Sequence, residues 1–191
     1  MKKYELTEET VTVYGKTLYR IRAVRDFGSV KTGEFGGYIE KEENLSHFGN
    51  AWVFDNAWVF DNARVYDNAW VFGNAWVFNN ARVYDNAWVY DDAWVCGDAK
   101  VYGDAWVSGN AEVFNTRHFF VQGPIGSRNG FITFYRTKDN TVEVRCGCFS
   151  GSLQKFVDRV EETHGGSRYE KEYKLAAELA KVCIRLEEVS E

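Results

Sequence analysis

The hydrophobic pattern of this chain is dominated by residues 45–115, in which one six-residue phrase recurs. From Ala51 to Ala111 an alanine stands at every sixth position, and a valine follows two places later, from Val53 to Val113. The second place mostly carries Trp, Arg or Lys, and the fourth mostly Phe or Tyr. Side chains alternate across a strand, so Ala and Val point one way and the larger residues the other. The pattern predicts stacked short strands with Ala and Val inside and the aromatic residues outside.

A period of eighteen residues is superimposed on this repeat. Successive second places hold Trp, Trp and Arg or Lys, and this order occurs three times. A strict six-residue repeat is typical of a parallel β-helix, and the segment resembles the left-handed β-helix family, in which three hexapeptides form one triangular coil. Rungs would lie about 4.8 Å apart. Side one would stack Trp52, Trp70, Trp88 and Trp106, side two Trp58, Trp76 and Trp94, and side three Arg64, Arg82 and Lys100.

The fifth and sixth places of the repeat hold Asp, Asn and Gly. These residues tolerate the left-handed backbone angles that sharp corners need. The amide side chains could also hydrogen-bond from coil to coil. The asparagines expected in such ladders are Asn56, Asn62, Asn68, Asn74, Asn80 and Asn86.

The segments on both sides of the repeat lack its six-residue period. Residues 1–44 predict an N-terminal β cap, with strands over 10–14 and 17–23 joined by a tight turn at Gly15 and Lys16. The repeat would start in degenerate form, with Leu45 at the alanine place and His47 at the valine place. Terminal repeats are often atypical because they close the stack, so His47 is interpreted as a capping residue.

Residues 116–191 predict a C-terminal α+β domain. Strands are expected over 119–121, 131–137 and 141–146, with a loop over 122–130. Helices are expected from about 152 to 164 and from about 168 to 188. The expected apolar stripe of the second helix contains Tyr169, Tyr173, Ala176, Leu179, Ala180 and Cys183.

Charge and composition limit the kinds of partner and the cellular compartment that the sequence favours. The net charge is −5, and residues 45–115 carry three bases against nine acids, so duplex nucleic acid is an unfavourable partner for the repeat. No apolar run is long enough to span a membrane, and the N-terminus lacks the apolar core of a signal peptide. The four cysteines are too irregular for a disulfide framework and suit a reducing compartment. We therefore expect a cytoplasmic protein.

Three segments outside the regular repeat support a closer resemblance. Residues 36–47, 147–153 and 162–165 look like those of uncharacterised hexapeptide-repeat proteins of phages, prophages and gut bacteria. The resemblance covers most of the chain and implies a genomic setting without an established activity.

Enzymatic alternatives have weak support. Many left-handed β-helix proteins are acyltransferases that use coenzyme A thioesters and a histidine, and a zinc site on this scaffold would need histidines in neighbouring coils. His47, His118 and His164 all lie outside the regular coils. Cys146 and Cys148 are separated by one residue, a weaker metal signal than the usual two-residue spacing. We expect a non-catalytic protein without a cofactor or bound metal, and keep an acyltransferase using His118 as the enzymatic alternative.

A candidate anion site lies in the C-terminal domain. Residues 147–152 are expected to lead from a strand into a helix N-terminus, where free backbone N–H groups and the helix dipole favour an anion. Nearby hydroxyl and guanidinium groups would add hydrogen bonds and charge. The candidate residues are Gly126, Ser127, Arg128, Arg136, Arg145, Ser150 and Ser152. The alternative is that Ser152 only caps the helix and the glycines only form turns.

The repeat surface offers a second kind of site. Two tryptophan ladders would exceed the apolar area that monomers usually expose, which favours a homo-oligomer or burial under the terminal domains; carbohydrate stacking is a weaker alternative. Side three would be a solvated face with Asp67 and Asp85 offsetting its cations, or would bind an anionic partner in which a nucleobase stacks on tyrosine.

Two functional hypotheses follow. In the first, the protein sequesters a small anionic, nucleotide-like ligand; the phage setting suggests, by analogy only, a signal of bacterial immunity. In the second, the aromatic faces grip a host or phage protein, as an interaction or inhibitor scaffold.

Overall fold

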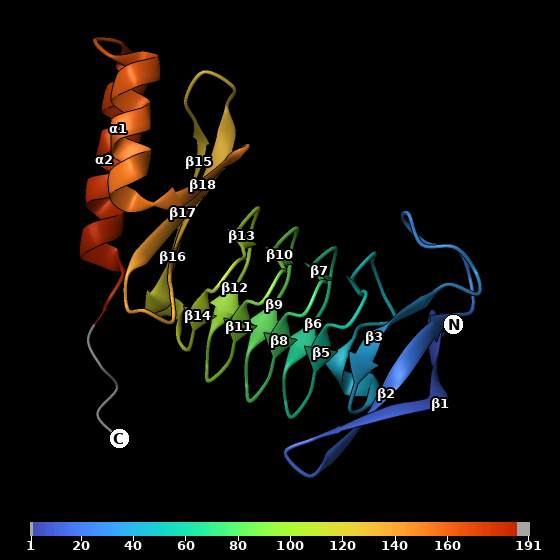
Figure 1. Ribbon diagram of the computed structural model, residues 1–191. Coiled ribbons are helices and arrows are strands. Elements are labelled where there is room, and N and C mark those ends of the chain that lie inside the picture. Colours follow the sequence, from blue (N-terminus) through green and yellow to red (C-terminus); the bar gives the residue numbers. More distant parts are fainter. Residues whose placement is uncertain (1, 187–191) are drawn as a thin grey trace.

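The computed structural model describes residues 2–186 and shows a mainly-β protein organised around a β-solenoid (Figure 1). A small strand region precedes the solenoid, and a four-stranded sheet with two helices follows it. The predicted fold class and the three-part order along the chain are confirmed.

The solenoid has three sides, each a ladder of two-residue strands in parallel register. Trp70 pairs with Trp52 and Trp88, and Arg82 pairs with Arg64 and Lys100, which confirms the eighteen-residue coil. Side one contains β4 (Trp52–Val53), β7 (Trp70–Val71), β10 (Trp88–Val89) and β13 (Trp106–Val107). Side two contains β5 (Trp58–Val59), β8 (Trp76–Val77), β11 (Trp94–Val95) and β14 (Glu112–Val113). Side three contains β6 (Arg64–Val65), β9 (Arg82–Val83) and β12 (Lys100–Val101).

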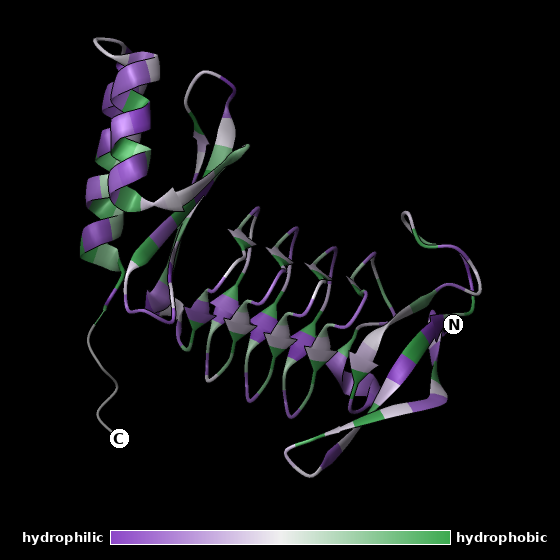
Figure 2. Ribbon diagram, in the orientation of Figure 1, coloured by the Kyte–Doolittle hydropathy of each residue, from purple (hydrophilic) through white to green (hydrophobic). Residues whose placement is uncertain are grey.

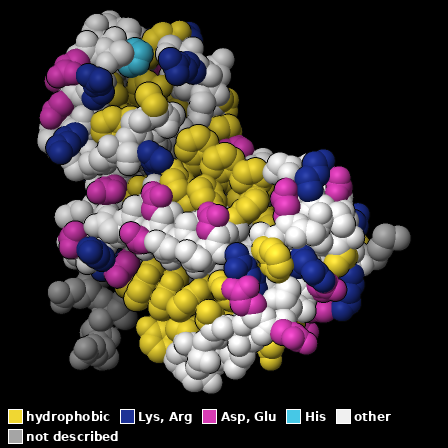
Figure 3. All heavy atoms as spheres, turned by 45° about the vertical axis from the view of Figure 1, so that its right-hand side comes forward, with side chains coloured by type: hydrophobic (Ala, Val, Ile, Leu, Met, Phe, Trp, Pro, Cys, Tyr) yellow, Lys and Arg dark blue, Asp and Glu magenta, His cyan; other side chains and the backbone are white. Residues whose placement is uncertain are grey.

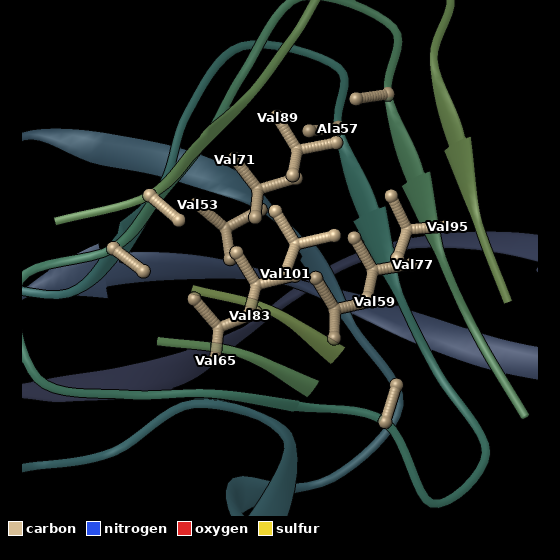
Figure 4. Packing of buried hydrophobic residues seen from close by; sticks show 14 of the residues in the cluster. Val53, Ala57, Val59, Val65, Val71, Val77, Val83, Val89, Val95 and Val101 are labelled. Carbon is tan, nitrogen blue, oxygen red and sulfur yellow. The ribbon is translucent and has the colours of Figure 1, made fainter. Parts of the chain in front are cut away.

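The interior of the solenoid is made of the small residues of the repeat. The alanines and valines from Ala51 to Val113 are at most 1% exposed. Valines from the three sides form three columns that converge on the axis (Figure 4). The narrow bore admits only small side chains, so the strict Ala and Val places follow from close packing.

The corners behave as the sequence predicts. The fifth place adopts a positive φ in coil after coil, for example 60° at Asp67 and 69° at Gly103. Sixth-place amides form ladders: Asn50 Nδ2 donates to Asn68 Oδ1 at 3.1 Å, and Asn68 Nδ2 to Asn86 Oδ1 at 3.3 Å. Each coil is therefore tied to the next by side chains as well as by strand pairing.

The prediction that aromatic side chains lie outside holds with three exceptions. Trp52 is fully buried because Phe27 and Tyr4 of the N-terminal region pack edge-on against it. Phe60 and Tyr90 are 1% and 8% exposed, the first under the N-terminal strands and the second under Arg145. The terminal regions thus cover part of the aromatic surface, which is one of the two arrangements expected for it, the other being a homo-oligomer.

The N-terminal strands β1 (Tyr4–Val13), β2 (Lys16–Ala23) and β3 (Phe35–Ile39) extend the sheet of side two. The hairpin turn falls at Tyr14 and Gly15, both with positive φ, one residue before the predicted position. After the 3₁₀ turn η1 (Glu42–Asn44), Leu45 pairs with Val65. Leu45 therefore takes the valine place and not the predicted alanine place, because two extra residues are accommodated before Asn50.

The C-terminal region docks on the open end of the solenoid. Its elements are η2 (Thr116–His118), β15 (Phe119–Ile125), β16 (Gly130–Arg136), β17 (Val142–Cys146), β18 (Phe149–Ser152), α1 (Leu153–His164) and α2 (Arg168–Cys183). Trp106 N donates to Thr133 Oγ1 at 3.0 Å, and Lys138 N to the Asn110 carbonyl at 3.0 Å. Strand β16 thereby caps the last coil.

Several predicted boundaries in this region were wrong. β15 runs to Ile125, which shortens the expected loop over 122–130, and residues 149–152 form β18 and not a loop. α2 ends at Cys183, with the Ile184 N–H bonded to the Ala180 carbonyl. Of the predicted extension to about residue 188, residues 187 and 188 lie outside the described chain. Leu179, expected on the buried stripe, is 47% exposed.

Candidate functional site

A cavity of about 550 Å³ lies between the C-terminal sheet, α1 and the last coil of the solenoid. Its walls come from the loop after β15, the turn between β17 and β18, the inner face of α1, and Trp106 with Asp104. This volume is typical of small-molecule sites, which are concave and mostly apolar with a few polar groups.

Aromatic rings form the inner wall of the cavity. Phe156 contacts Phe149 and Tyr173 edge-on, at ring-centroid distances of 5.4 and 5.7 Å. His164 lies 5.7 Å from Tyr173, and Phe131 at the cavity margin is 41% exposed. The rings fix one another, so the apolar wall is largely preformed.

Three guanidinium groups line the same cavity: Arg128 from the loop after β15, Arg145 from β17 and Arg159 from α1. Arg145 Nε donates to the Tyr90 hydroxyl at 2.6 Å, which ties the sheet to the solenoid. Arg128 and Arg159 are exposed. The cavity thus combines an aromatic interior with two exposed guanidinium groups and one tied to the solenoid, an arrangement suited to a flat anionic molecule.

The loop that carries Arg128 is held by α2. Gly126 has φ of +71°, and its N–H donates to Glu172 Oε2 at 2.9 Å. A Cβ at this position would lie 1.9 Å from the Tyr173 hydroxyl. Only glycine allows Tyr173 to pack this closely under the loop, so Gly126 acts by positioning the cavity wall.

Burial shifts the titration of two groups on the wall. It raises the pKa of Tyr173 to about 12, with the neighbouring Cys146 thiol as a further cause. Burial also raises the pKa of Cys146 above its ordinary value. Both groups are therefore neutral near pH 7 and add no charge to the cavity.

The structure brings together only part of the predicted anion site. Ser127, Arg128 and Arg145 line the cavity, and Gly126 lies behind its wall. Arg136, Ser150 and Ser152 do not line it. Arg136 Nη1 pairs with Glu112 Oε2 at 3.3 Å and its guanidinium packs on Phe114, outside the cavity.

Of the segment 147–152, which was expected to bind an anion at the start of α1, residues 147–149 line the cavity, whereas Ser150 and Ser152 do not. Ser152 accepts from Lys155 N at 3.4 Å and so caps the helix, as the alternative interpretation states. Ser150 lies in β18, paired with Arg145. Strand β18 engages the backbone that the prediction left free.

Sequence reasoning missed several residues of the cavity. They are Trp106, Phe131, Phe149, Arg159, His164 and Tyr173. Phe149 and Phe156 are ordinary apolar positions in the sequence, and Arg159 falls on the polar face of its helix. Only the packing of α1 across the sheet brings them to one place, so no local pattern identifies them.

A comparison with protein families supports the repeat. A family model described as a YdcK beta solenoid repeat matches residues 63–79 and 81–97, which form the middle coils. The chain carries a β-solenoid repeat. No curated protein matches the chain. In residues 2–186, none of the helices combines the length and apolarity needed to cross a membrane.

The histidines of the two solenoid ends have structural partners. His118 is 2% exposed, and its Nδ1 accepts from Phe114 N at 3.2 Å. Burial, with Arg136 nearby, lowers the pKa of His118 to about 4. His47 stacks on Tyr4 at 4.3 Å, and its Nδ1 accepts from Lys3 N. His118, the residue on which the acyltransferase alternative relied, therefore lies buried at the end of the solenoid.

Proposed function

We propose that this protein is a non-catalytic binding protein that sequesters a small anionic, nucleotide-like ligand in the cavity of its C-terminal region. The single observation that carries the proposal is the union of Arg128, Arg145 and Arg159 with an aromatic wall around about 550 Å³. The guanidinium groups would bind phosphate or another anionic group, and Phe131 and Phe149 would contact a flat ring.

The test is calorimetric titration of the purified protein with a panel of mononucleotides and cyclic dinucleotides, with inorganic phosphate as the minimal anion. Arg128→Ala and Arg159→Ala should each weaken binding at least tenfold, because a charge-assisted hydrogen bond is lost. Lys155→Ala is the matched control, since Lys155 lies one helical turn before Arg159, is exposed and does not line the cavity.

Three results would separate the possibilities. Nucleotide binding that fails in the arginine variants and survives Lys155→Ala supports sequestration. Equal affinities for phosphate and for nucleotides would show that the aromatic wall contributes nothing to ligand binding. No binding from the whole panel, with a native mass spectrum showing only apoprotein after incubation in bacterial lysate, would refute the proposal.

A second candidate is a protein-interaction or self-association surface on sides one and two. Trp70, Trp88, Trp76 and Trp94 remain partly exposed outside the solenoid. Figure 3 shows hydrophobic side chains gathered on two neighbouring surfaces, separated by a band of polar and acidic residues. Light scattering of the intact protein and of Trp76→Ser and Trp88→Ser tests this candidate; a monomer in every case would leave self-association without support.

A further inference from the structure

Side three differs from the other two sides in its outward chemistry. Its strands present Arg64, Arg82 and Lys100, which we call the basic ladder, and Figure 2 shows hydrophilic colouring along β6, β9 and β12. Arg64 and Lys100 are two rungs, about 10 Å, apart. All three side chains are exposed.

Asp67 and Asp85, which were expected to offset the basic ladder, lie near Tyr66, where burial and their charges raise the pKa of the tyrosine, but neither forms an ion pair with the ladder. No described residue forms an ion pair with Arg64, Arg82 or Lys100. Asp85 Oδ2 instead accepts from Gly103 N at 3.0 Å, within the corner ladder. Three cations in register therefore form a line of exposed positive groups on an otherwise acidic solenoid.

A second ladder runs beside the first. Tyr66, Tyr84 and Tyr102, the tyrosine stack, lie face to face at 5.0 and 5.5 Å. Phe119 packs edge-on against Tyr102 at the C-terminal end of the stack. At the opposite end, Tyr66 contacts Tyr84 through one ring face, and within residues 2–186 its other face meets no aromatic ring.

The chain leaves the next rung of the tyrosine stack empty. Ser46 N donates to the Val65 carbonyl, just as Tyr66 N donates to Val83 and Tyr84 N to Val101. Ser46 thus occupies the tyrosine place of the preceding coil with a side chain too small to cover Tyr66. A hollow of about 280 Å³ lies at this point, lined by Glu43, Ser46, Arg64, Val65, Tyr66 and Arg82.

We propose that side three binds single-stranded nucleic acid, with one base stacked on Tyr66 in the empty rung and successive phosphates along Arg64, Arg82 and Lys100. A cationic groove beside an aromatic platform is the common design of single-strand binding sites. The Glu43 carboxylate in the hollow accepts hydrogen bonds, which favours bases with an exocyclic amino group such as cytosine. This site lies apart from the cavity and does not depend on the proposed function.

The test is fluorescence anisotropy of the full chain with a labelled single strand of about four nucleotides. Three phosphate contacts predict a slope of about −2 for log K against log salt, or a loss of about 20-fold between about 50 and 200 mM salt. Arg64→Ala should reduce the slope by about 0.7, whereas Arg64→Lys should preserve it. Oligo(dC) should bind more tightly than oligo(dT).

Two further variants examine the base. Tyr66→Ala should weaken binding roughly tenfold with the salt slope unchanged, because a stacking contact is lost and no charge is removed. Ser46→Tyr should also abolish the base contact by filling the empty rung, while every cation remains. Arg128→Ala, in the cavity, should bind the strand as the unmodified protein does.

Several outcomes would overturn the assignment. A polyanion without bases, such as heparin or polyphosphate, that displaces the strand equally at matched charge would show a general polyanion surface. Unchanged affinity for the strand in both Tyr66→Ala and Ser46→Tyr would show that no base stacks on Tyr66. In the Arg128→Ala protein, in which nucleotide binding to the cavity is weakened, a single nucleotide that binds as well as the tetramer would exclude the ladder of phosphate contacts.

Discussion

Replacing Gly126 by alanine tests how the cavity wall is held. The new Cβ would lie 1.9 Å from the Tyr173 hydroxyl oxygen and 2.2 Å from the ring carbon that bears it. These separations are far below van der Waals contact, so either Tyr173 or the loop must move. The φ of +71° adds a separate cost for any residue with a Cβ.

The magnitude follows from these two terms. The left-handed backbone costs about 1 kcal/mol for alanine, and overpacking a well-filled site costs typically about 2 kcal/mol more. A total of about 3 kcal/mol should lower the midpoint of thermal unfolding by roughly 6 to 12 °C in a protein of this size. Because Tyr173 lines the cavity, ligand affinity should fall as well.

Gly103→Ala supplies the matched control. Gly103 has φ of +69°, and a Cβ there would meet no atom within 4 Å. This variant should show the backbone cost alone, about 1 kcal/mol, or roughly 2 to 4 °C. Differential scanning calorimetry of both variants measures the difference. Equal shifts in the two proteins would show that the contact of Tyr173 with Gly126 has no energetic weight.

Three further predictions concern the solenoid and its ends. Val83→Ala should destabilise the protein by about 2 to 3 kcal/mol in guanidinium unfolding, because two buried methyl groups leave a void on the closed axis. Stability should decline as pH falls from about 6.5 to about 4, since His118 is neutral when folded with a lowered pKa of about 4 and the unfolded chain takes up the proton first; His118→Asn should flatten this decline, which is roughly 3 kcal/mol in full. Deleting residues 69–86 removes one coil in register, so single-strand binding should lose about 0.7 of its salt slope with Arg82 while cavity ligands bind unchanged, as anisotropy and calorimetry can check.

The sequence predicted those parts of the fold that depend on local period. Three patterns agree with one another: Ala and Val at fixed places, Asp, Asn and Gly at the corners, and the recurrence every eighteen residues. Together they predict the three sides and their ladders without any knowledge of long-range contacts. The strict period also made the basic ladder visible. The ion pairing of this ladder could not be predicted, because the Asp85 carboxylate could bond either to a cation or to the backbone of the next corner. In the structure it accepts a hydrogen bond from Gly103 N.

The cavity depended on contacts that no period records. Arg145 meets Tyr90 across 55 positions, and Gly126 meets Glu172 across 46. Residues 149–152 could equally begin a helix or extend a hairpin, and pairing with β17 decided for the strand. For this reason the backbone of residues 149–152 is not free for an anion as expected. Arg128 and Arg145, two of the predicted residues, line one cavity.

The stacked coils of the solenoid fix the distance between the two proposed sites along its axis. The cavity borders Trp106 in the last coil on side one, whereas the empty rung lies before the first regular coil on side three. Strand pairing recurs every eighteen residues in the regular coils, so the solenoid rises by one rung with each such coil. The number of coils therefore sets the separation of the sites in steps of about 4.8 Å, and it sets the number of cations on side three by the same count.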